Sequence, residues 1–275
     1  MADISDVQDA LVTQITKVVY PNGPSLPSAL PGKQGVKIYP GWPNSAGLNN
    51  DIAAGILNCS VFALPSHSKL TTRYPRDWHP AGPAAPLALA VAQTKTQTTF
   101  TGTPAVNQII GIRCAKAVYS YAVATTDTLE TIATAIASLV PGASADGATV
   151  TVPAAPDFLV RLGQMRLIER EIRRQQQMVA VTLWCTSPDT RNKLGSLIDG
   201  ALADVDWLPL PDGTYGWLKY ASTANDDVPT KDALWKRTLQ YLIEYPTMQT
   251  QVAPPLLFEI IDRTANNSTV SETVL

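Results

Sequence analysis

The hydrophobic pattern of the chain is clearest in residues 178–185, which read MVAVTLWC. Successive side chains of a β-strand point to opposite sides, so Val181 and Leu183 would face one way and Ala180 and Trp184 the other. Both sets are largely apolar. The pattern therefore predicts a strand that is covered on both faces.

A helix is predicted directly after this strand. Ser187 has the side chain of an N-cap residue, and Pro188 suits the first helical position. Apolar residues then recur every three or four positions from Leu194 to Val205, which places them on one face of the helix. We expect this strand and helix to form the core of an α+β fold.

Shorter patterns predict the elements on either side of this unit. Ser5 and Gln8 have the spacing of a capping box, which predicts a helix over 5–19. Pro65 and Pro246 are expected to end strands, because proline cannot donate a backbone hydrogen bond. The strands are predicted over residues 35–39, 56–64, 207–210, 214–221 and 235–245.

Two local signals complete the prediction for these parts of the chain. Asp212-Gly213 lies between two apolar runs, which is a strong hairpin signal. Residues 48–55 are expected to form one or two helical turns, and residues 222–231 a loop.

The composition changes near residue 80, where PAGPAAP (80–86) has the character of a linker. A segment rich in Thr, Ala and Val follows, with a helix that Asp127 and Glu130 would cap. A second proline-rich join is expected at 153–156. Strands are predicted in this module over residues 87–92, 96–103, 108–114, 117–124 and 148–152.

The chain is therefore divided into four segments. Residues 1–80 and 164–250 are the two parts of the core, and residues 81–163 are an inserted small α+β module. Residues 251–275 are a C-terminal arm.

Two surface segments are candidates for protein interfaces. Residues 164–177 are the most charged part of the chain, and their basic residues are either a solvated face or a contact with acidic groups of a neighbouring subunit. The arm carries an apolar run that would either dock on another chain or pack on its own subunit. The interface candidates are Arg166, Arg170, Arg173, Arg174, Leu256, Leu257 and Phe258.

Composition and charge exclude several classes of function. Only 16% of the residues are charged, against about 25% in average globular proteins, which suits a subunit with several protein neighbours. The net charge is −2 without a basic tract, so sequence-specific nucleic-acid binding is not expected. No apolar run is long enough to span a membrane, and Asp3, Asp6 and Asp9 replace the basic start of a signal peptide.

The sequence offers little chemistry of its own. Cys59, Cys114 and Cys185 match no zinc spacing and are expected to be reduced thiols. His67 and His79 lie in polar loops, with no nucleophile motif nearby. We therefore predict no catalytic residue, no cofactor and no metal, although a site built from distant residues remains an open alternative.

The order of the predicted elements, together with several short motifs, resembles the tail terminator family of contractile-tailed phages. The resemblance covers roughly residues 1–80 and 165–250, with the module inserted between them. Its motifs are Val36-Lys37-Ile38-Tyr39, Gly41-Trp42-Pro43, Thr72-Arg73-Tyr74-Pro75, Asp77-Trp78, Leu183-Trp184 and the segment from Arg237 through Glu244-Tyr245-Pro246-Thr247.

The resemblance implies a tail terminator-like core, with helices packed on a mixed sheet, and a virion structural protein. Such a subunit forms a ring, expected to be a hexamer, at one end of the tail, and its partners are tube and sheath proteins. Two positions are open: a neck-proximal terminator, or a baseplate-proximal adaptor of the ripcord type. We expect the module to face the sheath and the core to pack on the tube.

The module has a resemblance of its own. Residues 119–123 (YSYAV) followed by 127–133 (DTLETIA) are similar to modules of phage sheath and baseplate proteins, and also to the peptidoglycan-binding LysM pattern. A LysM motif usually has Gly before the Asp, and here Thr126 holds that place. The LysM-like resemblance implies an alternative function, a module that binds cell-wall glycan.

Overall fold

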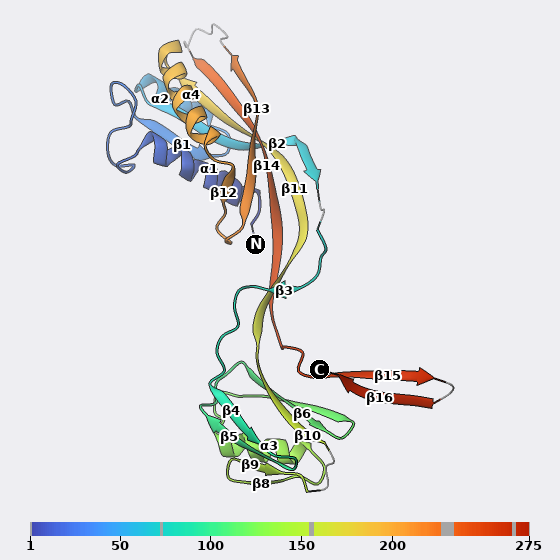
Figure 1. Cartoon of the computed structure of the whole chain (residues 1–275). Helices are drawn as coiled ribbons and strands as arrows, with labels where there is room; N and C mark the ends of the chain where they lie inside the picture. Colours follow the sequence, from blue (N-terminus) through green and yellow to red (C-terminus); the bar gives the residue numbers. More distant parts are fainter. Residues whose placement is uncertain (1, 72–73, 154–156, 227–233, 266–267, 275) are drawn as a thin grey trace. The chain divides into compact units, whose positions relative to one another are not determined.

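A computed structural model describes residues 2–71, 74–153, 157–226, 234–265 and 268–274, with side chains described outside 66–68 and 259–274 (Figure 1). The fold class is α+β, as the sequence predicts. The chain forms two compact units. Unit 1 contains Met1–Asp77 and Arg170–Gln249, and unit 2 contains Trp78–Glu169 and Thr250–Leu275.

Unit 1 is built on a mixed sheet. Its strand order is β1-β2-β11-β14-β13-β12, in which β1 runs parallel to β2 and the described pairs of β2, β12 and β13 with their other neighbours are antiparallel. The strands are β1 (Val36–Pro40), β2 (Leu57–Leu70), β11 (Arg166–Cys185), β12 (Trp207–Pro209), β13 (Tyr215–Asp226) and β14 (Trp235–Ala253). The helices are α1 (Ile4–Val19), α2 (Ser45–Ala53) and α4 (Pro188–Ala203).

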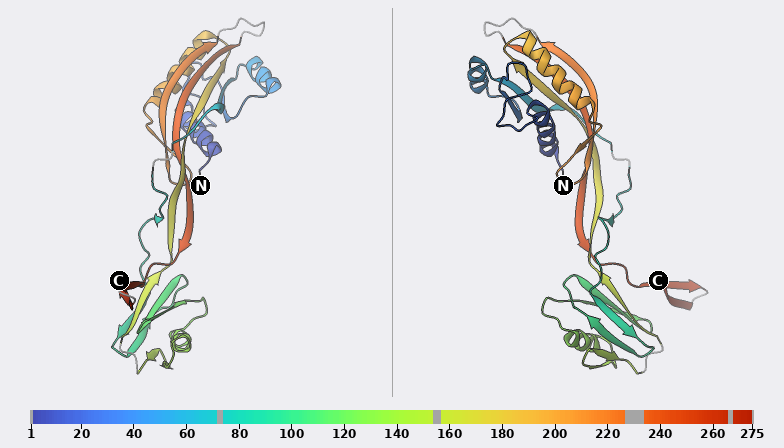
Figure 2. Two further views of the ribbon diagram at one scale, coloured as in Figure 1. Left: turned by 90° about the vertical axis from the view of Figure 1, so that its right-hand side faces the viewer. Right: turned by 60° about the vertical axis from the view of Figure 1, so that its left-hand side comes forward.

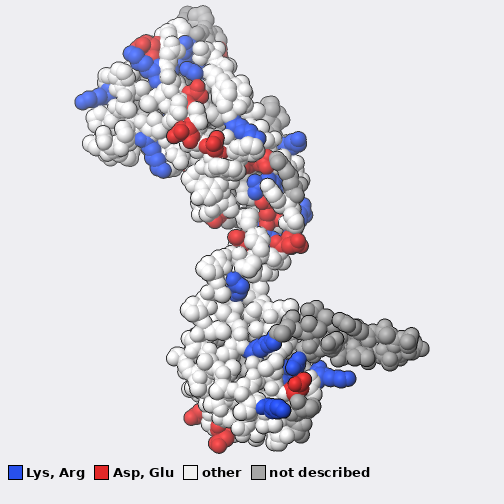
Figure 3. All heavy atoms as spheres, in the orientation of Figure 1, with Lys and Arg blue, Asp and Glu red and all other residues white. Residues whose placement is uncertain are grey.

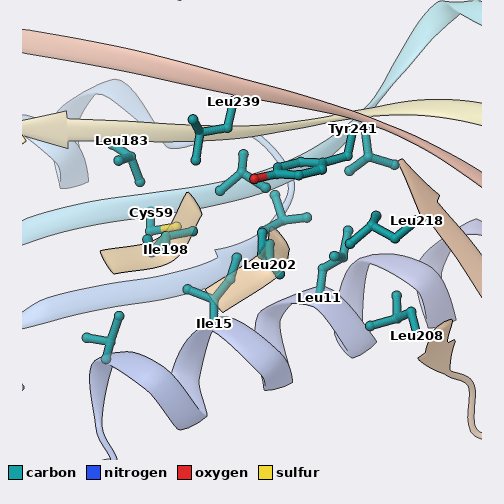
Figure 4. Close-up of a cluster of buried hydrophobic side chains, with 14 of the residues drawn as sticks. Leu11, Ile15, Cys59, Leu183, Ile198, Leu202, Leu208, Leu218, Leu239 and Tyr241 are labelled. Atoms are coloured by element: carbon teal, nitrogen blue, oxygen red, sulfur yellow. The ribbon is translucent and has the colours of Figure 1, made fainter. Parts of the chain in front are cut away.

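Helices α1 and α4 contact each other and share one hydrophobic core with the sheet (Figure 2). Figure 4 shows Leu11 and Ile15 of α1 and Leu202 of α4 pointing toward the strand side chains, among them Tyr241. All residues from Val179 to Cys185 in β11 are buried, which confirms the prediction of a strand covered on both faces. The hairpin predicted at Asp212-Gly213 is also confirmed, because β12 pairs with β13 across it.

The predicted N-cap of α4 is confirmed, and the predicted N-cap of α1 is wrong by two residues. Ser187 caps α4 and Pro188 follows it, as predicted. Helix α1 is capped by Asp3 instead of Ser5, because the Asp3 carboxylate accepts hydrogen bonds from the backbone N–H groups of Ser5 and Asp6. Gln8, the expected partner of Ser5, instead donates to the carbonyl of Val61 in β2 at 3.2 Å.

Four strands are longer than the sequence predicts, and the first is β11, which begins at Arg166 instead of Met178. β2 continues through Pro65 because its register against β11 shifts there, and an irregular segment accommodates the missing donor. β14 continues through Pro246, since its pairing with β13 ends at Glu244 and one side of the strand is open beyond that point. β13 includes residues 222–226, which were predicted to be loop.

Unit 2 contains two small sheets around a second core, with strand orders β4-β5-β9-β8 and β10-β6-β7. Its helix, α3 (Leu129–Leu139), is capped by Thr128 instead of Asp127. Strands β8 and β10 were not predicted. The strands are β3 (His79–Pro80), β4 (Leu89–Gln93), β5 (Gln97–Gly102), β6 (Gln108–Cys114), β7 (Ala117–Ala122), β8 (Ser144–Asp146), β9 (Thr149–Thr151), β10 (Phe158–Gln164), β15 (Glu259–Ala265) and β16 (Ser268–Val274).

Asp127 serves a different purpose from the predicted cap. Its carboxylate accepts hydrogen bonds from the Tyr121 hydroxyl at 2.9 Å and from the Ala124 backbone N–H at 2.7 Å. It therefore fixes the turn between β7 and α3. The C-terminal residues, predicted to be a separate arm, belong to the same compact unit as the module.

The displaced cap of α1 gives the first prediction. We expect Asp3→Ala to lower the free energy of unfolding of unit 1 by about 1 kcal/mol at pH 7. Ser5→Ala, the comparison variant, loses the exposed hydrogen bond from its own hydroxyl but keeps both backbone bonds to Asp3, so it should lower this free energy by less than Asp3→Ala does. Five of the six tryptophans lie in unit 1, so urea unfolding followed by tryptophan fluorescence reports on this unit.

The effect of Asp3→Ala should depend on pH. The hydrogen bond from the Ser5 hydroxyl, followed by those from the two backbone N–H groups, lowers the pKa of Asp3. The stabilisation is therefore complete above the unfolded pKa of about 3.9 and is lost as the pH falls through the folded pKa. A difference between wild type and Asp3→Ala that is equal at pH 7 and pH 2.5 would contradict this cap.

Candidate interaction surfaces

Two of the three cysteines are buried, and His79 lies beside a carboxylate. Burial raises the pKa of the Cys59 thiol and raises that of Cys185 to about 12, so both stay protonated at neutral pH. His79 is exposed and lies 3.6 Å from Glu169. The side chain of His67 lies outside the described residues, and no metal-binding group of His, Cys, Asp or Glu occurs among the residues searched.

The four candidate arginines do not form one patch. Arg166 belongs to unit 2 and donates to the carbonyl of Gly82 at 3.3 Å. Arg170 belongs to unit 1 and donates from Nε to the Gln249 side chain at 3.0 Å. These two side chains therefore contact their own units, and the remaining two differ sharply from each other.

Arg174 belongs to a partly buried charged network. Two of its nitrogens donate to the Glu171 carboxylate at 3.0 and 2.8 Å, and a third lies 4.0 Å from Glu244, which is only 4% exposed. Its guanidinium also lies over the ring of Tyr74, 5.0 Å from the centroid. The hydrogen bonds to Glu171 raise the pKa of Arg174. This arginine stabilises the fold of unit 1 and is not available to a partner.

Arg173 is exposed and lines a basic pocket of about 480 Å³. Strand β2 brings Lys69 to this place, because Leu70 pairs with Gln175 in the antiparallel register of β2 and β11. The described residues around the pocket include three bases and no acid. We call it the basic pocket, and its residues are Lys69, Leu70, Arg76, Ile172, Arg173 and Gln175.

Sequence reasoning missed Lys69 and Arg76. Each is isolated among polar residues of the chain, and about 100 positions separate them from Arg173. Only the pairing of β2 with β11 brings them together. A prediction of the register of these two strands would have been the one signal able to find the pocket.

Strand β12, at the other edge of the sheet, carries an aromatic surface. Trp207 stacks on Trp217 with ring centroids 6.0 Å apart, and Lys219 Nζ lies 3.1 Å from the Trp217 centroid. Trp207 is 56% exposed and Tyr215 is 55% exposed. Aromatic side chains of this kind are enriched in protein interfaces. We call Trp207, Tyr215 and Trp217 the aromatic hairpin surface.

The apolar run of the C-terminal arm packs mainly on its own unit. Leu257 and Phe258 lie against Gly111 of β6, and Leu257 with Pro255 lies against Gly163 of β10. Arg161 donates to the Leu257 carbonyl at 3.0 Å and lies over the Phe258 ring at 5.0 Å. Packing on the same chain is therefore what the structure shows for these two residues, while Leu256 is 78% exposed.

Charge is sparse on the surface, as the composition implies. On the face that Figure 3 shows, basic and acidic residues are interspersed over unit 1, and much of unit 2 is neutral. No helix of the described residues is both long enough and apolar enough to cross a membrane. No family model matches the sequence, and no curated protein matches it either.

The contrast between two neighbouring arginines gives the second prediction. Arg174→Met removes the cation from the Glu171 and Glu244 carboxylates and should lower the free energy of unfolding of unit 1 by about 3 kcal/mol. Arg173→Met, its matched control on the exposed side, should change it by less than about 0.5 kcal/mol. Urea unfolding followed by tryptophan fluorescence measures both. If Arg174→Met lowered the free energy of unfolding no more than the small change expected for Arg173→Met, the network around Arg174 would not stabilise the fold.

The packing of the arm gives the third prediction. A Cβ at Gly163 would overlap with Pro255 and would lie 2.9 Å from Leu257 Cδ2, so Gly163→Ala should displace the segment. We expect chymotrypsin to cleave after Phe258 several-fold faster in this variant, as measured by mass spectrometry. Gly200→Ala is the control, because a Cβ there meets nothing within 4 Å. Unchanged cleavage in Gly163→Ala would contradict the observed packing.

Proposed function

We propose that this chain is a structural protein of a phage virion, a ring-forming adaptor at one end of a contractile tail that links the tube to the sheath. The observation that carries the proposal is the presence of two unlike candidate contact surfaces on different strands of one sheet, toward the two ends of its strand order. The basic pocket lies beside β2 and β11, and the aromatic hairpin surface lies on β12 and β13. A closed ring of identical subunits needs two such different faces on each copy.

The motifs that resemble tail terminators also come together in space. Trp42 and Trp184, from two different motifs, lie edge to face with centroids 5.5 Å apart. Tyr74 and Glu244, from two others, both contact Arg174. These contacts show that residues of several motifs pack together, and we infer that unit 1 has a tail terminator-like fold.

The finer assignment follows the same resemblance. The ring is a hexamer, its core packs on the tail tube, and the module faces the sheath. Its position is either next to the neck or next to the baseplate, where it would contact proteins of those assemblies. The low charge density of the chain suits a subunit that several protein neighbours surround.

The glycan-binding alternative gains no support from the module. In its described residues the segment 81–163 contains one helix and seven strands, β4 to β10, which is more strands than a LysM motif needs. The residues that resemble LysM hold a turn together through Asp127 and Tyr121. We therefore keep glycan binding only as an outcome of the test.

The fourth prediction is a closed oligomer. Light scattering coupled to size exclusion should show a concentration-dependent species of six 29.5 kDa chains, about 177 kDa in total. In the phage that encodes the chain, disrupting its gene should stop the assembly of complete tails, while heads still form. The chain supplied from a plasmid should restore them and should be found in the purified particles.

Two results would contradict the proposed function. One is a chain that stays monomeric at high concentration and is absent from the particles. The other is a purified chain that sediments with peptidoglycan while tail assembly proceeds normally without it, which would favour the glycan-binding alternative.

A further inference from the structure

We propose that the basic pocket of one copy binds the carboxylates of Asp204 and Asp206 of a second copy, and that this contact joins neighbouring subunits. The inference deepens the proposed function and rests on it, since it names the two faces that meet in the ring. The occupant is therefore a second copy of this chain, presenting an acidic loop next to an exposed tryptophan.

The described lining of the basic pocket carries three bases and no acid. Its closest acid along β11, Glu171, is held by Arg174. Among the described residues, Lys69 and Arg76 form no ion pair, and the described polar contact of Arg173 is with the hydroxyl of Thr247 at 3.3 Å. Three bases around one hollow are an arrangement that favours a carboxylate-bearing partner.

Asp204 and Asp206 are placed where they do not help their own fold. Asp204 is the C-cap of α4, a helix that has no basic residue in its last turn. A negative charge at the C-terminus of a helix is unfavourable, because the helix dipole is negative there. Both carboxylates are exposed and form no ion pair in the described part of the chain. Their charge is therefore available to another molecule.

The two surfaces also match in their apolar parts. Leu70, in the basic pocket, is 61% exposed, and Trp207, next to Asp206, is exposed as well. A contact that brings opposite charges together would also cover these two side chains. Water is then removed from apolar surface, which is the favourable part of most protein associations.

The sheet order makes the contact possible in a ring. β2 lies near one edge of the sheet and β12 forms the other edge, with β11, β14 and β13 between them. A contact between these two different faces leaves each copy with one unused pocket and one unused acidic loop. The same contact can then repeat from copy to copy until the ring closes.

The fifth prediction is a charge-swap experiment on the full chain. Lys69→Glu with Arg173→Glu should raise the concentration at which rings form by at least tenfold, and Asp204→Lys with Asp206→Lys should do the same. Combining all four substitutions in one chain should restore assembly to within a few-fold of wild type. An equimolar mixture of the two double variants should also assemble, since each supplies the charge that the other lacks. Light scattering measures each midpoint at low and at high salt.

The control matched to the Lys69 and Arg173 variant is Lys95→Glu with Lys116→Glu, which makes the same change in net charge on exposed residues of unit 2. It should assemble like wild type, and tryptophan fluorescence should show that unit 1 is folded in every variant. Wild-type rings should weaken as salt is added, because exposed charges are screened.

The outcomes separate the two proposals. Rings that form normally in both double variants, or double variants that neither the fourfold combination nor the mixture rescues, would overturn the pairing and leave the ring-forming function in place. A wild-type chain that stays monomeric would overturn the ring and the pairing together.

Discussion

The double-sided burial of β11 is the constraint on which unit 1 depends. From Val179 to Cys185 every residue of this strand is buried, so a polar change on either face meets packed atoms. Trp184 donates from its indole nitrogen to Ser60 at 3.3 Å on one face, while Leu183 lies in the shared core of α1 and α4 on the other. A shift of one residue in the pairing of β11 would turn each of its side chains to the opposite face. The side chains buried on both faces therefore fix the register of the strand. The register of β2 against it follows, and with it the position of Lys69 beside Arg173.

The sequence predicts those parts of the fold that depend on local pattern. The alternation over Met178–Cys185, the cap at Ser187 and the turn at Asp212-Gly213 are all signals within a few residues, and all three are confirmed. The strand ends predicted at Pro65 and Pro246 were wrong, because the effect of a proline on a strand depends on neighbouring strands that lie far away in the chain. Pro65 sits in a register irregularity, and Pro246 lies where a strand has lost one partner. Neither the register irregularity nor the missing partner strand can be recognised from the local sequence.

The candidate site was predictable only in part, for the same reason. The charge of residues 164–177 was visible, and it drew attention to Arg173, which lines the basic pocket. The sequence could not distinguish Arg173 from Arg174. Glu171, the main partner of Arg174, is near in the chain, but Glu244, which also lies beside it, is 70 positions away. The apolar run at Leu257 and Phe258 was visible too, but its partners are Gly111 and Gly163. A glycine has no side chain and adds nothing to a hydrophobic pattern. The surface at Gly111 and Gly163, on which the arm packs, therefore cannot be found by looking for apolar residues.

The two neighbouring arginines show how one strand can serve the fold and an interface at once. An arginine in a partly buried network has to pair with acids of its own chain. Removing it would leave the carboxylates without a cation, and this would lower the free energy of unfolding by more than the network contributes to it. Arg174 holds Glu171, and the described residues that line the pocket around Arg173 include no acid. The exposed base is then a consequence of the internal pairing, and not an independent feature. Because isolated exposed ion pairs contribute only about 0–1 kcal/mol each, such a charge stabilises the monomer little. In the ring that we propose, the contact repeats from copy to copy, so that several weak pairs would act together with the apolar surface they surround.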